Sequence, residues 1–198
     1  MILYLGLDPS RYLCTKPLLH YPVIRTEKMG FGDEICLLWS QFTHVIFTSQ
    51  TAVSYWFEEK IPFDKQAIAI GRATARQLEM LGILPIVAEV ETQEGVIALL
   101  EKMDLEGAFV FWPRSKRARP VLTRYLQDRG VFCCALDLYD TVLQKLEPVP
   151  DLKEVEEIVF TSPSTVEGFL RIYGELPTDK ILRGVGPITR QVLESSVL

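Results

Sequence analysis

The sequence is poor in the residues that metal centres and disulfide frameworks need. It has only two histidines, His20 and His44, and four cysteines without a C-x-x-C pair. The adjacent Cys133 and Cys134 would point to opposite faces of a strand. These shortages argue against a structural zinc site and against a disulfide-stabilised fold. We therefore expect no metal, reduced thiols and a cytoplasmic location.

Long apolar runs, an excess of positive charge and nucleotide-binding motifs are also missing. No run of about eighteen apolar residues could span a membrane, and the short apolar N-terminus has no basic leader. The formal net charge of −5 argues against nucleic acid as a partner. The chain has neither a P-loop nor a G-x-G-x-x-G fingerprint, so it gives no indication of ATP or NAD. We expect no cofactor.

Short β-branched runs alternate with longer amphipathic stretches along most of the chain, which is typical of an α/β fold. Several of the short runs are continuously apolar, as parallel strands covered on both faces are. The expected strands are Ile2–Leu7, Val45–Thr48, Ala67–Ile70, Pro85–Ala88, Ala108–Trp112, Cys133–Leu138, Ile158–Thr161 and Ile181–Val185. The expected helices are Thr51–Glu59, Ala73–Leu81, Gln93–Met103, Ala118–Arg129, Thr165–Ile172 and Ile188–Ser195.

Two stretches of the chain are nearly the same. His44–Val53 reads HVIFTSQTAV and Glu157–Val166 reads EIVFTSPSTV. Farther along, a Gly-x-x-Thr turn begins at Gly71 in the first copy and at Gly186 in the second. Each copy is therefore predicted to be a β–α–β–α unit. A repeat of this kind indicates two similar parallel-sheet lobes of flavodoxin-like type and not a solenoid, which needs at least three copies.

Two charged, extended stretches, Pro22–Lys28 and Tyr139–Leu146, resemble linkers between the lobes. The simplest division gives a discontinuous first lobe of residues 1–28 plus 143–198 and a second lobe of residues 29–142. Two extended linker strands would join them, with a cleft between. The C-terminal copy lacks a counterpart of Ile83–Met103. Its sheet is therefore expected to be small, with an exposed edge or a clipped sequence.

Hydroxyls and free backbone N–H groups at the start of a helix form an anion-binding arrangement. Thr-Ser and Gly-x-x-Thr follow neighbouring strands, so they would lie side by side on the carboxyl edge of a parallel sheet, where ligands bind. Helix capping, worth about 1 kcal/mol, explains each serine alone but not the recurrence of both motifs. The basic segment 114–119 (RSKRAR) also follows a strand. It would suit a polyanionic ligand, or it is a solvated helix start.

Segments of both copies together resemble the uroporphyrinogen-III synthase family. They read VIFTSQTAV, AIGRATARQLEMLGI, LYDTV, VFTSPSTVEGF and GVGPITRQVLE, and the resemblance covers residues 43–198. Members of this family have two α/β lobes joined by a pair of extended strands. They act without a cofactor on hydroxymethylbilane, a linear tetrapyrrole with eight carboxylates, and close it to uroporphyrinogen III. The resemblance thus implies a lyase of heme biosynthesis that releases water and inverts the last pyrrole ring.

The resemblance also implies which residues contact the substrate. The family's most important tyrosine falls on Tyr139, which is expected to be the catalytic proton donor. The substrate-facing hydroxyls of the family fall on Ser49, Thr74, Ser162 and Thr189. The residues expected to bind the substrate are Thr48, Ser49, Gln50, Gly71, Thr74, Arg114, Ser115, Lys116, Thr161, Ser162, Pro163, Gly186 and Thr189.

The reaction that the resemblance implies needs no strong base and no metal. Loss of hydroxide from the first ring gives an azafulvene, which the last ring attacks through its substituted carbon. The spiro intermediate then fragments and closes again with that ring reversed. Uncatalysed closure is easy but gives isomer I, so the enzyme has to hold one geometry and help the hydroxyl leave. Small hydroxyls, N–H groups and a phenol suit this task.

Two other functions stay open from the sequence alone. The repeats would equally fit a non-catalytic two-lobed binding module for a small polycarboxylate. The short C-terminus would fit an inactive, truncated relative that is retained for protein interaction. For the enzyme we expect a monomer that binds a small polycarboxylate and neither nucleic acid nor a membrane. Isomer III in excess of isomer I, after mixing with hydroxymethylbilane, would distinguish the enzyme from both alternatives.

Overall fold

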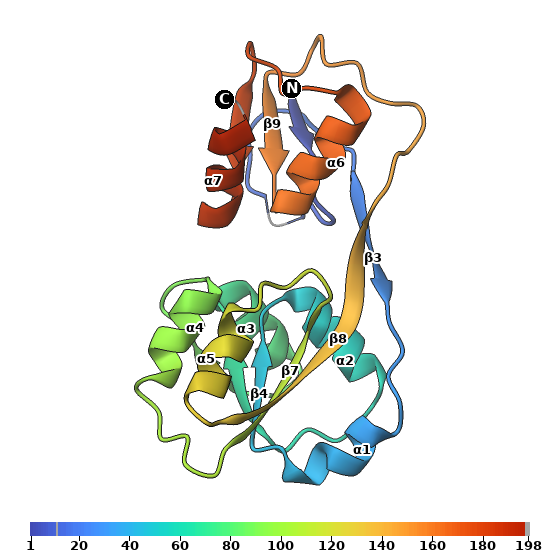
Figure 1. Ribbon diagram of the computed structural model, residues 1–198. Coiled ribbons are helices and arrows are strands. Elements are labelled where there is room, and N and C mark those ends of the chain that lie inside the picture. Colours follow the sequence, from blue (N-terminus) through green and yellow to red (C-terminus); the bar gives the residue numbers. More distant parts are fainter. Residues whose placement is uncertain (11, 197–198) are drawn as a thin grey trace. The chain divides into compact units, whose positions relative to one another are not determined.

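The fold consists of alternating strands and helices (Figure 1). A computed structural model describes residues 1–10 and 12–196. Residue contacts divide the chain into two compact units. Unit 1 comprises residues 1–26 and the segment from Thr141 onward, and unit 2 is Glu27–Asp140. Residues 11, 197 and 198, which the sequence analysis assigns to the first lobe, lie outside the described residues.

The larger sheet has six strands in the order β3-β8-β7-β4-β5-β6, and the pairs β8–β7, β7–β4, β4–β5 and β5–β6 are parallel. Its strands are β3 (Ile24–Lys28), β4 (His44–Phe47), β5 (Gln66–Ala69), β6 (Ile86–Val87), β7 (Phe109–Ser115) and β8 (Phe132–Leu143). The helices of this part are α1 (Glu34–Leu38), the 3-10 helix η1 (Trp39–Gln41), α2 (Gln50–Glu58), α3 (Arg72–Met80), α4 (Gln93–Leu100) and α5 (Val121–Asp128).

Both faces of the larger sheet are covered, as the continuous apolar runs predict. Val45 and Phe47 of β4 are fully buried in one core together with Trp56 of α2. Ile46, which lies between them in the strand, is buried in a second core with Trp112. Because successive side chains of a strand point to opposite faces, these two cores lie on the two sides of the sheet. This burial explains why every residue of the VIF run has to be apolar.

The smaller sheet, in unit 1, has four parallel strands in the order β10-β9-β1-β2. Its strands are β1 (Ile2–Tyr4), β2 (Leu18–His20), β9 (Glu157–Phe160) and β10 (Ile181–Gly184). Its helices are α6 (Pro163–Tyr173) and α7 (Pro187–Ser196), which pack against each other. In Figure 1, α7 is drawn to the left of β9 and α6 to its right. The N-terminal strand β1 pairs with β9, so the two ends of the chain share one sheet.

The predicted repeat is confirmed in both position and topology. The first copy is β4-α2-β5-α3 and the second is β9-α6-β10-α7. In each copy the first strand has the second strand on one side and a strand from outside the copy, β7 or β1, on the other. This reversal of strand order creates a topological switch point, where α/β proteins bind ligands. Counted along the chain, the strands of unit 1 read 2-1-3-4, the flavodoxin order without its fifth strand.

Three short elements were not predicted: β2, α1 and η1. Each has only three to five residues, which is too few to show a periodic pattern. The predicted helix Ala118–Arg129 begins only at Val121 because Ser115 O accepts a hydrogen bond from Ala118 N (2.9 Å) and closes a turn before it. Among the described residues, no helix is both long and apolar enough to cross a membrane.

The predicted strand Cys133–Leu138 is part of a longer one, β8, whose twelve residues include most of the stretch interpreted as a linker. Its end runs antiparallel to β3: Met29 N donates to Leu138 O (2.8 Å) and Gln144 N donates to Val23 O (2.9 Å). Figure 1 shows the two strands pointing in opposite directions. The two extended stretches are therefore a hydrogen-bonded pair of strands and not two independent linkers.

Candidate functional site

The Thr-Ser pair of unit 2 lies directly after β4, at the switch point of the larger sheet. Ser49 is the N-cap of α2, and its Oγ accepts a hydrogen bond from Ala52 N at 3.0 Å. The neighbouring Thr48 Oγ1 accepts a hydrogen bond from Trp112 Nε1 at 3.1 Å. Gln50 is the first residue of the helix. Both hydroxyls thus have structural roles, and the capping role of Ser49 is real.

Ser49 has a second contact, with the predicted catalytic residue. Its Oγ lies 2.8 Å from the phenol oxygen of Tyr139, a hydrogen bond in which either oxygen can be the donor. Tyr139 is only 6% exposed. Burial raises the pKa of its phenol above 10, and hydrogen bonds from Ser49 and Ser115 partly oppose this rise. The phenol is therefore protonated at neutral pH.

A β-bulge positions the Tyr139 side chain. Along the β7–β8 pair, Arg114 is opposite Asp137, but the next residue, Ser115, is opposite Tyr139, so that Leu138 is the extra residue. Such a bulge redirects the side chains of a strand and is frequent beside active sites. Lys116 N then donates a hydrogen bond to the Tyr139 carbonyl oxygen at 2.8 Å. The basic segment and the tyrosine are thus fixed to each other by the backbone.

Most positive charges of the basic segment are already paired within the chain. The pairs are Arg114–Asp137 (2.9 Å), Arg117–Asp140 (3.4 Å) and Arg119–Glu94 (2.7 Å). The Arg119 guanidinium lowers the pKa of Glu94 to about 2. Lys116 is exposed and makes no ion pair with any residue that the structure describes. Within this segment, Lys116 is therefore the cation available to an anionic ligand.

The Gly-x-x-Thr turn of unit 2 is occupied by a side chain of the protein itself. Gly71 is the N-cap of α3, and Thr74 is buried in the first turn. The carboxylate of Glu91, an exposed residue between β6 and α4, accepts a hydrogen bond from Arg72 N at 2.9 Å. A Cβ added to Gly71 would lie 2.4 Å from the Glu91 carboxyl carbon. A side chain at position 71 would therefore push the Glu91 carboxylate away from its place at this helix end.

The Thr-Ser pair of unit 1 follows β9 at the switch point of the smaller sheet. Thr165 Oγ1 accepts hydrogen bonds from the backbone N of Thr161 (3.1 Å) and of Ser162 (3.2 Å), and Pro163 contributes no N–H. The N–H of Thr165 is directed to the Ser162 carbonyl oxygen (3.0 Å). The Oγ of Ser162 is buried and faces the Thr165 N–H in a capping-box arrangement, but it makes no hydrogen bond of normal geometry with any described residue. At this helix start, the serine hydroxyl is the unsatisfied group.

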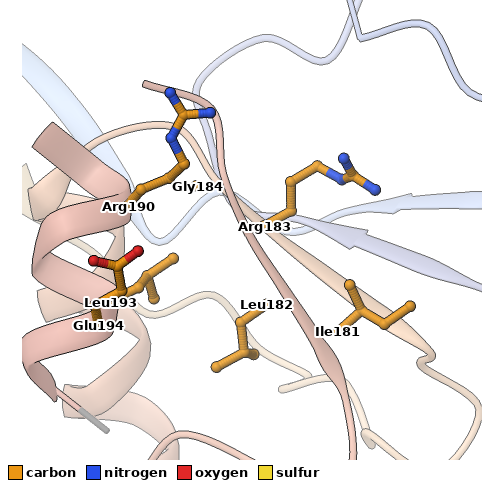
Figure 2. A pocket seen from close by; sticks show the side chains of 7 residues that line it. All are labelled: Ile181, Leu182, Arg183, Gly184, Arg190, Leu193 and Glu194. Atoms are coloured by element: carbon orange, nitrogen blue, oxygen red, sulfur yellow. The ribbon is translucent and has the colours of Figure 1, made fainter. Parts of the chain in front are cut away.

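The Gly-x-x-Thr turn of unit 1 is open, unlike its counterpart. A Cβ added to Gly186 would meet no atom within 4 Å, and Thr189 is 3% exposed in the first turn of α7. The next residue, Arg190, lines a surface pocket of about 330 Å³ between β10 and α7. In Figure 2 its side chain points away from Glu194 and from the apolar side chains of the pocket. No described residue forms an ion pair with Arg190.

The same pocket marks the open edge of the smaller sheet. It lies beside β10, which is the edge strand. In the larger sheet the equivalent strand, β5, is instead covered by β6. The small sheet with an exposed edge agrees with the expectation from the sequence.

The described residues contain no metal centre: nowhere do three histidine, cysteine, aspartate or glutamate side chains come close enough to hold an ion. The thiols of Cys14, Cys36, Cys133 and Cys134 are free. The chemistry available at the two sheet edges is therefore that of hydroxyls, backbone N–H groups, a buried phenol and a few unpaired cations. These groups can bind carboxylates and donate a proton.

Sequence analysis missed two residues of these edges, Glu91 and Arg190. Arg190 could have been identified because it directly follows the Gly-x-x-Thr motif in the chain. Glu91 had no such signal, since it is twenty residues away from Gly71 in the chain. In unit 2 the structure brings together Ser49, Ser115 and Tyr139.

Comparison with known proteins gives one family. Residues 18–198 match the family model described as uroporphyrinogen-III synthase HemD. A provisionally named uroporphyrinogen-III synthase of Methanothermobacter thermautotrophicus is 32% identical, over 90% of this chain and 78% of that protein. The uroporphyrinogen-III synthetase of Helicobacter pylori has the same fold, with a TM-score of 0.70 at 20% identity over 100% of this chain and 89% of that one. A mutant synthase of Thermus thermophilus gives 0.68 at 20% identity, with 100% and 89% covered.

Proposed function

Because the chain belongs to the uroporphyrinogen-III synthase family, we propose that it closes hydroxymethylbilane with Tyr139 as proton donor and the two sheet edges as carboxylate-binding sites. The chain is a lyase of tetrapyrrole biosynthesis: it forms uroporphyrinogen III with loss of water and inversion of the last pyrrole ring. The observation that carries the proposed mechanism is the hydrogen bond between Ser49 and Tyr139.

Tyr139 would supply the proton for the departing hydroxide. Ser49 Oγ already accepts the N–H of Ala52, so its own proton is available to the Tyr139 oxygen. That donation leaves the phenol proton free for the substrate and stabilises the phenolate that forms when it is given up. The hydrogen bonds from Ser49 and Ser115 lower the pKa of Tyr139, as expected when they stabilise the phenolate, against the larger rise that burial causes. A phenol activated in this way can act as a general acid at neutral pH.

The carboxylates of the substrate would be held by groups of both units. In unit 1 these are the Ser162 hydroxyl, the start of α7 at Gly186 and Thr189, and the Arg190 guanidinium. In unit 2 one exposed cation, Lys116, is joined to the tyrosine by a backbone hydrogen bond. Thr48, Gln50, Gly71, Thr74, Arg114, Ser115, Thr161 and Pro163 complete the proposed set. Many weak contacts suit a reaction in which holding one geometry decides the isomer.

We further propose that the enzyme works as a monomer in the cytoplasm and that its product is used for heme. The free thiols support this location, since disulfides form mainly outside the cytosol. Mixing the purified chain with freshly prepared hydroxymethylbilane tests the proposed function. An excess of isomer III over isomer I supports it, and isomer I alone would contradict it.

Replacing Ser162 with alanine is expected to raise KM about two- to fivefold, the 0.3–1 kcal/mol that an anion gains near a helix N-terminus. The melting temperature should fall little, because the buried Oγ makes no hydrogen bond of normal geometry and contributes only a weak capping-box contact. Steady-state kinetics and a thermal melt measure both quantities. Ser195→Ala is the control, because Ser195 is an exposed serine near the C-terminal end of α7, away from both helix starts. An unchanged KM would remove Ser162 from the substrate site.

Replacing Lys116 with glutamine is expected to raise KM severalfold at low salt and less at high salt, because an exposed charge is screened by ions. The value of kcat should change little, since the side chain acts on binding. Lys153→Gln removes an exposed charge from unit 1, one that pairs with Asp151, and serves as control. A KM that responds equally in both variants would indicate general electrostatic attraction and not a contact made by Lys116.

A further inference from the structure

The two Gly-x-x-Thr turns have the same sequence pattern but differ in what lies on them. In unit 2 the Glu91 carboxylate covers Gly71 and accepts the Arg72 N–H at 2.9 Å. In unit 1 the space over Gly186 is open to at least 4 Å. A carboxylate thus already rests on the turn to which the proposed function assigns a substrate carboxylate. Comparison of the two copies shows that the Glu91 carboxylate is found only in unit 2 and is not part of the shared Gly-x-x-Thr motif.

The segment that carries Glu91 is firmly held. Thr92 caps α4 by accepting the Gly95 N–H (3.1 Å), and Thr92 N bonds to Val90 O (2.8 Å). Gly95 packs so closely on Val90 that a Cβ there would lie 2.0 Å from the Val90 carbonyl oxygen. The backbone therefore delivers Glu91 to the α3 turn. Its side chain, by contrast, is exposed, so it can rotate into water at little cost.

We propose that Glu91 is an internal competitor: its carboxylate occupies the α3 turn in the free enzyme, and a carboxylate of the substrate must displace it. The proposal rests on the proposed function, which assigns Gly71 and Thr74 to the substrate. It makes Glu91 a specificity-determining residue, whose effect depends on how many carboxylates a ligand carries.

The selectivity follows from effective concentration. A tethered carboxylate competes at a high local concentration, which a free monocarboxylate does not reach. A substrate held by its other carboxylates also presents the competing one at high local concentration and can win. A small anion that binds only at the turn loses affinity by the full fraction that Glu91 occupies, whereas a substrate that is also held by other contacts loses less. Glu91 thus favours a polycarboxylate over the small organic acids of the cell.

Two variants of Glu91 and one control test the proposal. Glu91→Gln keeps an acceptor for the Arg72 N–H but removes the charge, and Glu91→Ala empties the turn. Glu89→Gln removes a nearby exposed charge that pairs with Lys102 and does not reach α3. The first measurement is KM and kcat for hydroxymethylbilane. The second, independent of activity, is the amide signal of Arg72 in ¹⁵N-labelled protein titrated with citrate.

The expected result is a KM about twofold to fivefold lower in both Glu91 variants, with kcat unchanged, since an exposed anion at a helix N-terminus has about this value. The citrate midpoint at Arg72 should fall by a larger factor, because citrate has fewer other contacts than the substrate, and Glu89→Gln should behave like the parent. The same citrate midpoint in all proteins would overturn the proposal, and so would a reduced kcat with an unchanged KM, which indicates a purely structural cap. A lower citrate midpoint with an unchanged KM would show that the substrate does not displace Glu91, and it would also overturn the proposal. Failure of the proposed function is seen separately, as the absence of isomer III.

Discussion

Replacing Tyr139 with phenylalanine is expected to slow the formation of uroporphyrinogen III by about a hundredfold. General acid catalysis is worth about 10²–10⁴-fold, and the lower end applies because the substrate loses hydroxide readily by itself. The ring and its packing beside Tyr55 are kept, so only the hydrogen bonds of the hydroxyl are lost, chiefly the one to Ser49. Loss of that bond should cost about 1 kcal/mol of stability. The rate of isomer III formation and the melting temperature measure the two effects.

Tyr55→Phe is the matched control for this experiment, since its ring lies 5.9 Å from that of Tyr139 and it has no role in the proposed mechanism. It should retain the rate of the parent. The pH profile gives a second check. Burial raises the pKa of Tyr139 above 10, so deprotonation of this phenol should not reduce the rate between pH 7 and about 10. A Phe variant with the parent rate and an intact fold would leave geometry as the whole contribution of the enzyme.

Replacing Gly95 with alanine is expected to destabilise unit 2 by about 3 kcal/mol, at the upper end of what overpacking costs. The new Cβ would lie 2.0 Å from the Val90 carbonyl oxygen, and backbone atoms cannot rotate away as a side chain can. The start of α4 has to move instead. For a protein of this size, this loss lowers the melting temperature by about 6–12 °C. Differential scanning calorimetry measures it and also separates the transitions of the two units.

Gly30→Ala is the control, because a Cβ at Gly30 meets no atom within 4 Å. Its melting temperature should stay close to that of the parent, as for most exposed substitutions. Equal melting temperatures for both variants would show that α4 tolerates the displacement. The close contact of Gly95 with Val90 would then not determine where Glu91 lies.

The strands and helices of the repeat were predictable from sequence because their physics is local. The VIF run of β4 is buried on both faces, so every residue is apolar, and the helix after it has a serine cap. The short strand β2 was not predictable. Its three residues have no periodic pattern, and they are a strand only because the neighbouring β1 provides hydrogen-bond partners. The continuation of β8 beyond Leu138 likewise depends on its partner β3.

The candidate site was predictable as a set of residues but not as a set of contacts. The repeated motifs identified Ser49 and Ser162, yet only the structure shows that the first is satisfied and the second is not. The basic segment suggested several cations, but pairs such as Arg119–Glu94 leave mainly Lys116 available. Such pairings join residues far apart in the chain. No local pattern encodes them, so composition overestimates the charge that a ligand meets.

The discontinuity of unit 1 has a consequence for the order of events during synthesis. Unit 2 is one continuous segment that is complete at Asp140, so it can fold while the ribosome is still adding residues. Strand β1 leaves the ribosome well before its partner β9, Glu157–Phe160, and has to wait for it. Until then one side of β1 is an unpaired strand edge, the kind of surface that invites pairing with other chains. The nascent chain is therefore most vulnerable at β1, and it passes this stage only when β9 has emerged.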